Sequence, residues 1–408
     1  MNILILTQYF PPETGAPQNR LYSLAVNLAN NGCSVDILTA MPNYPKMKIF
    51  QNYKNRFYIR EEDGPITIYR SWIYVMKSNN VVARLLNYFS FVFSSILIGI
   101  VKLKKQDIII CESPPLFLGL TALTLKEIKR AKLIFNVSDL WPESVEKLGI
   151  VNNKILLKAA YLLEGLIYKK SILVSGQTQG IVKSIKDRFP HVKTYWLRNG
   201  IDFEQFNINS DGSAFRADMN LSGSDFVLVY AGVFGYAQGL KTIIRASEIL
   251  RTQNNTKFFL IGDGPEKDKL IILANEKGLQ NLVFLPNKPR KEIPGIIAAC
   301  DAYIVPLKKN DLFKGAIPSK LFEPLAMGKP ILLGVDGEAR DQFIEKGKCG
   351  LYFEPENSTE LAHCINVLYN DKALAKELGE NGKHYVKQNF DRQVIAKEFY
   401  NELIKLAH

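Results

Sequence analysis

The chain has 408 residues, of which 47% are hydrophobic, 23% charged and 11% aromatic. Such a composition is typical of a globular protein and excludes a disordered, collagen-like or disulfide-scaffold chain. At about 100–200 residues per domain, the length predicts two domains, each with its own core. The formal charge of +12 favours anionic partners, namely nucleotides, lipid phosphates, an acidic membrane surface or nucleic acid.

The cysteines and the first residues bear on the compartment. The five cysteines are scattered and no two form a CxxC pair, so neither a zinc site nor a disulfide framework is expected. Reduced cysteines are typical of the cytosol. Residues 1–6 have no basic segment and too short an apolar run for a signal peptide, so we expect a buried strand there.

Strands and helices alternate along the first half. Residues 3–6 and 35–38 are apolar, and residues 20–30 between them carry leucines at helical spacing. Short links between such elements predict a right-handed crossover and a parallel sheet. Further strands are expected at residues 108–110, 133–137 and 172–174.

The alternation restarts after a turn signal at Arg198–Gly200. A helix is expected at residues 242–250. Strands are expected at residues 226–230, 258–261, 283–285, 302–305, 330–333 and 350–353. The fold class is therefore α/β, with two open, doubly wound parallel sheets. Since ligands bind at the carboxyl ends of such strands, two facing domains would create one cleft.

Residues 85–101 are almost free of charge and are flanked by Arg84 and by Lys102, Lys104 and Lys105. Three interpretations stay open for this segment. It is a helix facing the core, a helix lying in a membrane interface with its basic flank on lipid phosphates, or a short transmembrane span.

Three glycines, Gly232, Gly235 and Gly239, follow the expected strand 226–230. A glycine-rich loop before a helix can hold a diphosphate through its backbone N–H groups, although the same residues also serve tight turns. The spacing matches neither GxGxxG nor a Walker A motif. The next glycine-rich segment, 262–265, is either a turn or the floor of the cleft.

The segment 318–330 is the richest in chemistry. Ser319 is expected to cap a helix, which would place Lys320 and Glu323 on one face of its first turn. The lysine would neutralise a diphosphate as the bond to a sugar breaks, and the carboxylate would bind two ribose hydroxyls. The alternative for the pair is a surface ion pair.

Taken in order, these motifs resemble the retaining GT-B glycosyltransferases of family four over essentially the whole chain. The resemblance rests on the Gly15 loop and on segments 139–144 (DLWPES), 199–202 (NGID), 232–239, 262–265 and 323–330. Segments 139–144 and 318–323 together are most similar to the bacterial N-acetyl-L-fucosamine transferase subgroup. The resemblance implies two facing Rossmann-like domains: an acceptor-binding domain at 1–197 and a nucleotide-sugar-binding domain at 198–388. A final helix within 389–408 would pack back on the first domain.

The resemblance also assigns residues. Glu323 should bind the ribose, while Gly232 and Gly235 should meet the diphosphate. Asn287 and Lys288 should lie near the base. The predicted donor site is completed by Gly15 and Ala16, which close over the diphosphate from the other domain, and by Gln238, Gly262, Ser319 and Lys320.

Four positions depart from the family pattern. Gly315 stands where the family often has a glutamate that contacts the donor sugar. Val233 and Gln238 stand near the places of its arginine and lysine, so that Lys320 becomes the expected cation. Ser138 replaces a frequent histidine and leaves Asp139 as the polar group of that loop.

The expected activity is retaining transfer of a sugar such as N-acetyl-L-fucosamine from a UDP-sugar to a polyprenyl-diphosphate-linked saccharide of O-antigen or capsule. Asp139, Lys320 and Glu323 are the expected catalytic residues. No cofactor and no metal are expected, since no Asp-x-Asp motif is present. The expected location is the cytoplasmic membrane face, in peripheral contact with anionic lipid.

Two other functions are weighed. A sugar-nucleotide 2-epimerase would need acid–base groups, but none of the four histidines lies in a motif. A non-catalytic membrane subunit that binds nucleotide-sugar is suggested by Gly315. Nucleic-acid binding is not expected, because the basic residues do not form a known module.

Overall fold

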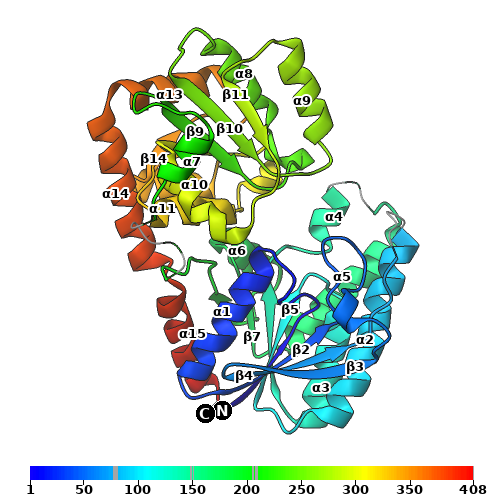
Figure 1. The fold of residues 1–408 in the computed structure, drawn as a ribbon. Helices are drawn as coiled ribbons and strands as arrows, with labels where there is room; N and C mark the ends of the chain where they lie inside the picture. Colours follow the sequence, from blue (N-terminus) through cyan, green and yellow to red (C-terminus); the bar gives the residue numbers. More distant parts are fainter. Residues whose placement is uncertain (77–80, 148, 150, 205, 207–209, 408) are drawn as a thin grey trace. The chain divides into compact units, whose positions relative to one another are not determined.

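The computed structural model describes residues 1–76, 81–147, 149, 151–204, 206 and 210–407. The chain forms two compact units (Figure 1). The first comprises Met1–Asn199 together with Arg392–His408, and the second comprises Gly200–Asp391. The chain thus leaves the first unit once and returns to it for the final helix.

The sheet of the first unit has eight strands within the described residues, in the order β3-β4-β2-β1-β5-β6-β7-β8. All neighbours are parallel except β3 and β4. The strands are β1 (Asn2–Leu6), β2 (Ser34–Ala40), β3 (Tyr58–Asp63), β4 (Ile66–Ser71), β5 (Ile108–Ser113), β6 (Lys132–Val137), β7 (Leu173–Gly176) and β8 (Thr194–Trp196).

The parallel first sheet carries one antiparallel strand at its edge, which the sequence pattern did not predict. Strand β3 pairs with β4 in an antiparallel hairpin that turns at Gly64, whose φ of 54° suits a glycine. Polar residues such as Glu61 and Glu62 make β3 unlike a buried parallel strand. A charged edge strand of this kind prevents pairing with other chains.

Helices cover both faces of the first sheet (Figure 1). Alternate residues of β1 point to opposite faces: Leu4 and Leu6 join one core with α2, α3, α5 and α6, whereas Ile3 and Ile5 join the other with α1 and α15. These helices and the short α4 are α1 (Ala16–Asn30), α2 (Val81–Lys102), α3 (Leu118–Lys129), α4 (Glu143–Lys147), α5 (Lys154–Lys170), α6 (Gln179–Arg188) and α15 (Arg392–Ala407). The predicted return of the final helix to the first domain is confirmed, because Phe399 and Leu403 of α15 are fully buried there.

The second unit contains a parallel sheet, six-stranded within the described residues, in the order β11-β10-β9-β12-β13-β14. Its strands are β9 (Phe226–Ala231), β10 (Thr256–Ile261), β11 (Leu282–Leu285), β12 (Ala302–Pro306), β13 (Ile331–Gly334) and β14 (Gly350–Tyr352). Its helices are α7 (Ser213–Asp218), α8 (Lys241–Ile249), α9 (Lys267–Glu276), α10 (Ile293–Ala299), α11 (Phe322–Ala326), α12 (Glu338–Arg340), α13 (Ser358–Asn370) and α14 (Lys372–Asn389). The predicted α/β class with two such domains is confirmed.

The strand order locates a switch point in each unit. In the second unit the chain runs from β9 outward to β10 and β11, and then crosses to the other side of β9 for β12. Strand β1 has the same place between β2 and β5 in the first unit. Loops at the carboxyl ends of β9 and β1 therefore border the crevices where ligands bind in open α/β sheets.

Helix α2 settles how the apolar segment 85–101 packs. By length and composition, Val82–Lys102 is long and apolar enough to cross a membrane, the one such helix among the described residues. Yet Phe91 and Ile98 are buried against the sheet, and Asn87 donates to the Tyr74 carbonyl at 2.7 Å. The other face exposes apolar side chains such as Phe93. The helix is thus core on one side and solvent-facing and apolar on the other.

Candidate functional site

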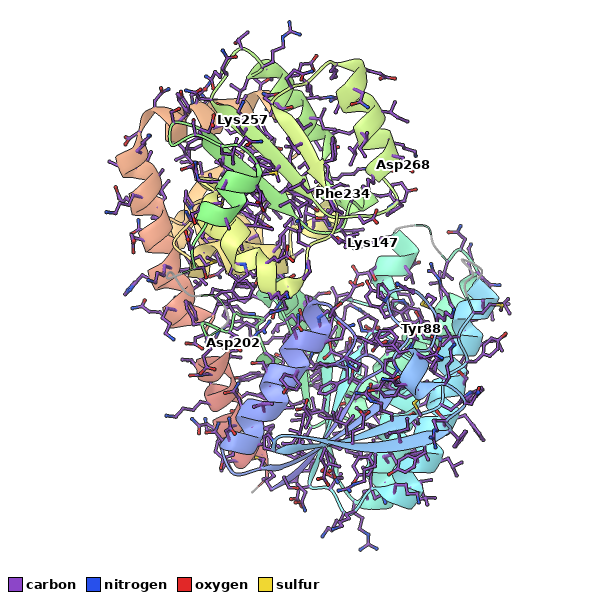
Figure 2. All side chains as sticks on the ribbon, in the orientation of Figure 1. Tyr88, Lys147, Asp202, Phe234, Lys257 and Asp268 are labelled. Carbon is purple, nitrogen blue, oxygen red and sulfur yellow. The ribbon has the colours of Figure 1, made fainter. Side chains whose placement is uncertain are left out.

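The candidate site of the second unit lies at the loop after β9. Gly232 and Gly262 have φ values of 152° and 154°, which glycine tolerates best. A Cβ on Gly262 would lie 1.9 Å from the Gly232 carbonyl oxygen. The loops after β9 and β10 therefore pack backbone against backbone, which explains why both segments are rich in glycine. The side chain of Phe234 is fully buried beneath them (Figure 2).

Lys320 reaches into this loop from a different part of the sequence. Its Nζ donates to the Tyr230 hydroxyl at 2.8 Å and to Gln238 Oε1, and it lies 4.2 Å above the Tyr230 ring. A Cβ on Gly232 would lie 3.2 Å from the same Nζ. The Tyr230 hydroxyl in turn donates to the Val233 carbonyl at 2.8 Å. The structure thus brings together Gly232, Gln238 and Lys320 of the predicted site.

The two groups that hold the Lys320 ammonium are both neutral. Burial lowers the pKa of its ammonium from 10.5 to about 7. Among the residues that the structure describes, Lys320 forms no ion pair, and its two hydrogen-bond partners are neutral. A buried cation without a carboxylate is costly unless a ligand supplies the negative charge. The site is therefore suited to an anion.

The local structure around Lys320 differs from the expectation. Ser319–Leu321 is a single 3₁₀ turn whose N-cap is Pro318, and α11 begins at Phe322. The prediction that Ser319 caps a helix is wrong, because Ser319 is already inside the turn and its carbonyl accepts the bond from Phe322. The surface ion-pair interpretation is not supported either, because the Lys320 ammonium is buried against Tyr230.

Glu323 lies near the carboxyl end of β9. The Tyr303 hydroxyl donates to the Ala231 carbonyl at 3.0 Å and accepts from the Ala231 N–H at 3.0 Å. Burial and, secondarily, the charge of Glu323 raise the pKa of that hydroxyl. Glu323 is half-buried. A carboxylate and a cation thus approach the end of one strand from one segment.

The remaining predicted donor-site residues lie at the same edge of the sheet. Gly235 precedes the 3₁₀ turn Tyr236–Gln238. Asn287 and Lys288 follow β11, where Lys288 Nζ lies 3.6 Å from the Glu292 carboxylate. Strand β10 separates β11 from β9. These residues therefore border the crevice without contacting Lys320 in any interaction that the structure records.

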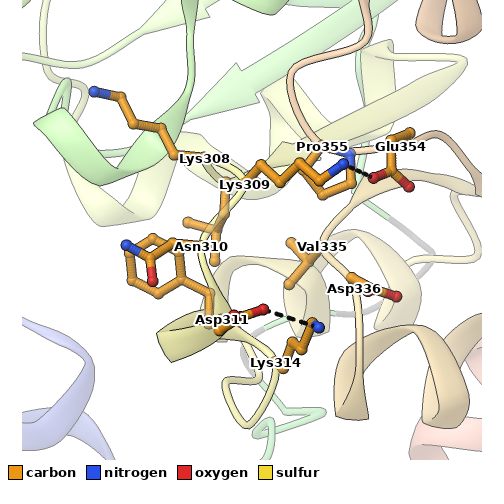
Figure 3. A pocket seen from close by; sticks show the side chains of 11 residues that line it. Lys308, Lys309, Asn310, Asp311, Lys314, Val335, Asp336, Glu354 and Pro355 are labelled. Carbon is orange, nitrogen blue, oxygen red and sulfur yellow. Dashed lines mark ion pairs between the residues drawn. The ribbon is translucent and has the colours of Figure 1, made fainter.

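A polar cavity of about 430 Å³ lies at the ends of β12, β13 and β14 (Figure 3). Ion pairs lie along its wall, with Lys309 Nζ 2.8 Å from Glu354 and Lys314 Nζ 2.9 Å from Asp311. Mixed cations and carboxylates suit a ligand rich in hydroxyl groups. The sequence pattern did not predict this cavity, although the polar run 308–310 shortly after β12 was a signal. Lys314, which lines the cavity, directly precedes Gly315.

In the first unit, buried Glu13 holds the loop after β1. Its Oε1 accepts from the backbone N–H groups of Asn43 at 2.7 Å and Tyr44 at 2.8 Å. This fixes the chain just before Gly15, and α1 begins at Ala16. The two predicted loop residues therefore lie at the N-terminus of a helix, and Glu13 is the anchor that sequence reasoning overlooked.

Asp139 follows β6 in the same unit. Its Oδ2 accepts from the Ser144 hydroxyl at 3.0 Å, and desolvation by the surrounding loop raises the pKa of this carboxyl. Beside it, buried Arg20 donates to Glu112 at 2.6 Å, and both bond to Ser138. Sequence reasoning missed this pair because its members stand 92 residues apart.

These two Rossmann-like α/β units with parallel sheets define the GT-B fold. Sucrose-phosphate synthase from Thermosynechococcus elongatus has the same fold, with a TM-score of 0.77 at 16% identity over 99% of this chain and 98% of that one. Anabaena Alr3699/HepE, solved with UDP and glucose, gives 0.72 at 20% identity over 99% of this chain and 100% of its own.

The sequence is similar to those of glycosyl transferases. Residues 212–385 match the family model described as "Glycosyl transferases group 1". The chain is also 25% identical to the Escherichia coli protein described as "Putative colanic acid biosynthesis glycosyl transferase WcaI", over 99% of this chain and 100% of that protein. The matched segment contains the glycine loop, Lys320 and Glu323. The chain is thus similar to glycosyl transferases of group 1 over residues 212–385 and to this relative over almost its whole length.

Proposed function

We propose that the protein transfers a sugar from a UDP-sugar, with retention at the anomeric carbon, to a saccharide carried on a polyprenyl diphosphate. The observation that carries the proposal is Lys320, which lies beside the glycine loop at the switch point and, among the described residues, forms no ion pair with a carboxylate. The structure of Anabaena Alr3699/HepE, which was solved in complex with UDP and glucose, supports the class of donor. The relative described as a putative colanic acid biosynthesis glycosyl transferase supports a role in bacterial surface polysaccharide.

The chemistry follows from charge development. The bond between the anomeric carbon and the β-phosphate oxygen breaks, and the acceptor hydroxyl forms its bond from the same face. The departing phosphate oxygen takes the acceptor proton. Lys320 and the amides after β9 stabilise the charge that develops on the leaving diphosphate as the bond breaks in the transition state. Glu323 binds the ribose, and Asp139 orients the acceptor.

We further propose N-acetyl-L-fucosamine as a donor sugar, without a metal ion. The motif pairing 139–144 with 318–323 supports this choice. Because Gly315 supplies no carboxylate, we assign the binding of the sugar hydroxyls to the polar cavity that Lys314 lines. A screen of UDP-sugars by thermal shift, with and without EDTA, tests it. Equal thermal shifts for all UDP-sugars would contradict the proposed donor sugar. Loss of the thermal shift in EDTA would contradict binding without a metal ion.

The protein is proposed to act at the cytoplasmic face of the membrane. Helix α2 exposes Phe89 and Phe93, and exposed Lys102, Lys104 and Lys105 lie at its end. Apolar side chains beside lysines are suited to a leaflet that carries anionic lipid. This placement would bring the enzyme to a lipid-linked acceptor.

The experiment that tests the function is a transfer assay with purified protein, UDP-N-acetyl-L-fucosamine and lipid-linked acceptor. Lys320→Met and Glu323→Gln should each lower kcat/KM at least a hundredfold, as expected when one charge-stabilising group is removed. Exposed Lys346→Met and Glu276→Gln are the matched controls. Variants of Lys320 and Glu323 within twofold of wild type would overturn the site.

The same assay separates the alternatives. A 2-epimerase would release altered sugar without acceptor. A non-catalytic subunit would bind UDP tightly and turn over no acceptor. Product linked to the lipid acceptor, and formed only in its presence, is the result that we expect.

A further inference from the structure

A small apolar cavity of about 80 Å³ lies in the first unit, between the first turns of α2 and α5. Its walls include Leu85 and Tyr88 of α2 and Leu156 and Ala160 of α5. Tyr88 is labelled in Figure 2. Arg84 is the only charged residue among those that line it, within the described part of the chain. Such a lining favours a hydrocarbon over a sugar or a nucleotide.

The cavity shares a wall with the loop that carries Asp139. Trp141 lines it, and the Trp141 N–H donates to the Asp139 carbonyl at 2.9 Å. The Trp141 ring packs edge-on against Phe117, with centroids 5.4 Å apart. A lipid chain held in the cavity would therefore place its polar end near the loop of Asp139, the carboxylate that we propose orients the acceptor.

An exposed apolar stripe leads to the cavity. On α2 it recurs every three or four residues, so it occupies one face of the helix. Its members are Val82, Leu86, Phe89, Phe93, Leu97 and Ile100. The stripe reaches the cavity wall where the rings of Phe89 and Phe117 pack in a tilted arrangement, with centroids 4.9 Å apart. On α5, exposed Ile155 adjoins the lining residue Leu156.

One residue that lines the cavity is a cation, and two lysines lie close to lining residues of α5 in sequence. Arg84 is exposed at the cavity, and Lys154 and Lys158 are exposed on the first turns of α5. A ligand with an apolar chain and an anionic head complements this arrangement. An apolar stripe that enters a lipid surface would let such a chain pass from the bilayer to the cavity.

We propose that this cavity binds the first isoprene units of the acceptor's polyprenyl chain while Arg84 pairs with the acceptor's diphosphate. The inference rests on the proposed function, since it places that acceptor. It adds a binding site in the first unit, remote in sequence from Lys320 and Glu323, that selects acceptors by their lipid rather than by their sugar.

The test fills the cavity. Ala160→Leu adds a side chain at a buried lining position, and Ala159→Leu, the matched control, makes the same change at the exposed neighbouring position. Farnesyl diphosphate binding is followed by calorimetry. We expect binding to wild type and to Ala159→Leu, and at least tenfold weaker binding to Ala160→Leu. Equal binding to all three would overturn the proposal. If Ala160→Leu does not fold, Leu85→Gln at a half-buried lining position replaces it.

Kinetics separate this inference from the function itself. Ala160→Leu should lower kcat/KM at least tenfold for the polyprenyl-linked acceptor and leave it within twofold for the same saccharide diphosphate on a short alkyl chain. An equal loss on both acceptors would contradict a lipid-binding role. Weaker binding of Ala160→Leu to anionic vesicles would instead assign the cavity to bilayer lipid. Farnesyl diphosphate binding without transfer to any acceptor would overturn the function but not the site.

Discussion

At the scale of single residues, burial decides what Lys320 can do. The Lys320 ammonium lies against Tyr230, where burial lowers its pKa to about 7. Without ligand, Lys320 is therefore only partly protonated at neutral pH. An incoming diphosphate favours the charged form and draws a proton onto Nζ. The residue is therefore coupled both to ligand binding and to pH.

The first prediction concerns stability and pH. The folded-state pKa of Lys320 lies below its unfolded value of 10.5, so between about 7 and 10 the unfolded chain binds more protons. The destabilisation due to Lys320 is then full below pH 7 and fades as pH rises. In urea unfolding, any stability advantage of Lys320→Met over wild type should shrink from pH 7 to pH 10. Parallel pH curves for the two proteins would contradict the pKa.

Gly262 provides a prediction about backbone packing. A Cβ there would lie 1.9 Å from the Gly232 carbonyl oxygen, at a φ that favours glycine. Gly262→Ala should destabilise the protein by more than about 2 kcal/mol and weaken UDP binding, because the loop after β9 must move. Gly223→Ala, with no neighbour within 4 Å, is the control in chemical unfolding. Equal stability of the two variants would rule out the close approach.

At the scale of elements, α2 is the helix that we propose to contact the membrane. Phe93 is 66% exposed and makes little contribution to the core. Phe93→Glu should lower binding to anionic vesicles about thirtyfold, since a buried phenylalanine contributes about 2 kcal/mol, and should leave the melting temperature unchanged. Ile272→Glu, at an exposed position on α9, controls for added charge. Unchanged sedimentation of Phe93→Glu with vesicles would refute the membrane role of α2.

Elements were predictable where their strands are continuously apolar. Residues 108–113 and 226–231 form strands that are almost entirely buried. Each begins with an uninterrupted apolar run, which is typical of a buried parallel strand. The hairpin of β3 and β4 was missed because polar residues such as Glu61 and Glu62 interrupt its pattern. The helix start was predicted at Ser319 because the sequence does not distinguish the 3₁₀ turn that precedes α11 from the first turn of an α-helix.

The candidate site was predictable only in part. The glycine loop and the segment of Lys320 and Glu323 each stand out in the sequence. The contact between Lys320 and Tyr230 spans 90 residues and depends on the order of strands in the sheet. No local pattern encodes such a contact. The same holds for the buried pair of Arg20 and Glu112.

At the scale of the whole molecule, the last helix makes the first unit depend on both ends of the chain. Phe399 is fully buried and its ring lies 5.5 Å from that of Tyr195. Phe399→Ala should destabilise the first unit by about 3–5 kcal/mol. UDP binding in the second unit should persist. Calorimetric unfolding with exposed Val394→Ala as control checks this; loss of UDP binding by a folded Phe399→Ala protein would argue against it.

The most direct test of the central claim is proton uptake when UDP binds. If Lys320 receives the diphosphate, titration at pH 8 in two buffers of different ionisation enthalpy should show wild type taking up close to one proton. Lys320→Met should take up almost none and bind more weakly, while exposed Lys346→Met should match wild type. No uptake by wild type, or the same uptake by Lys320→Met, would contradict the account.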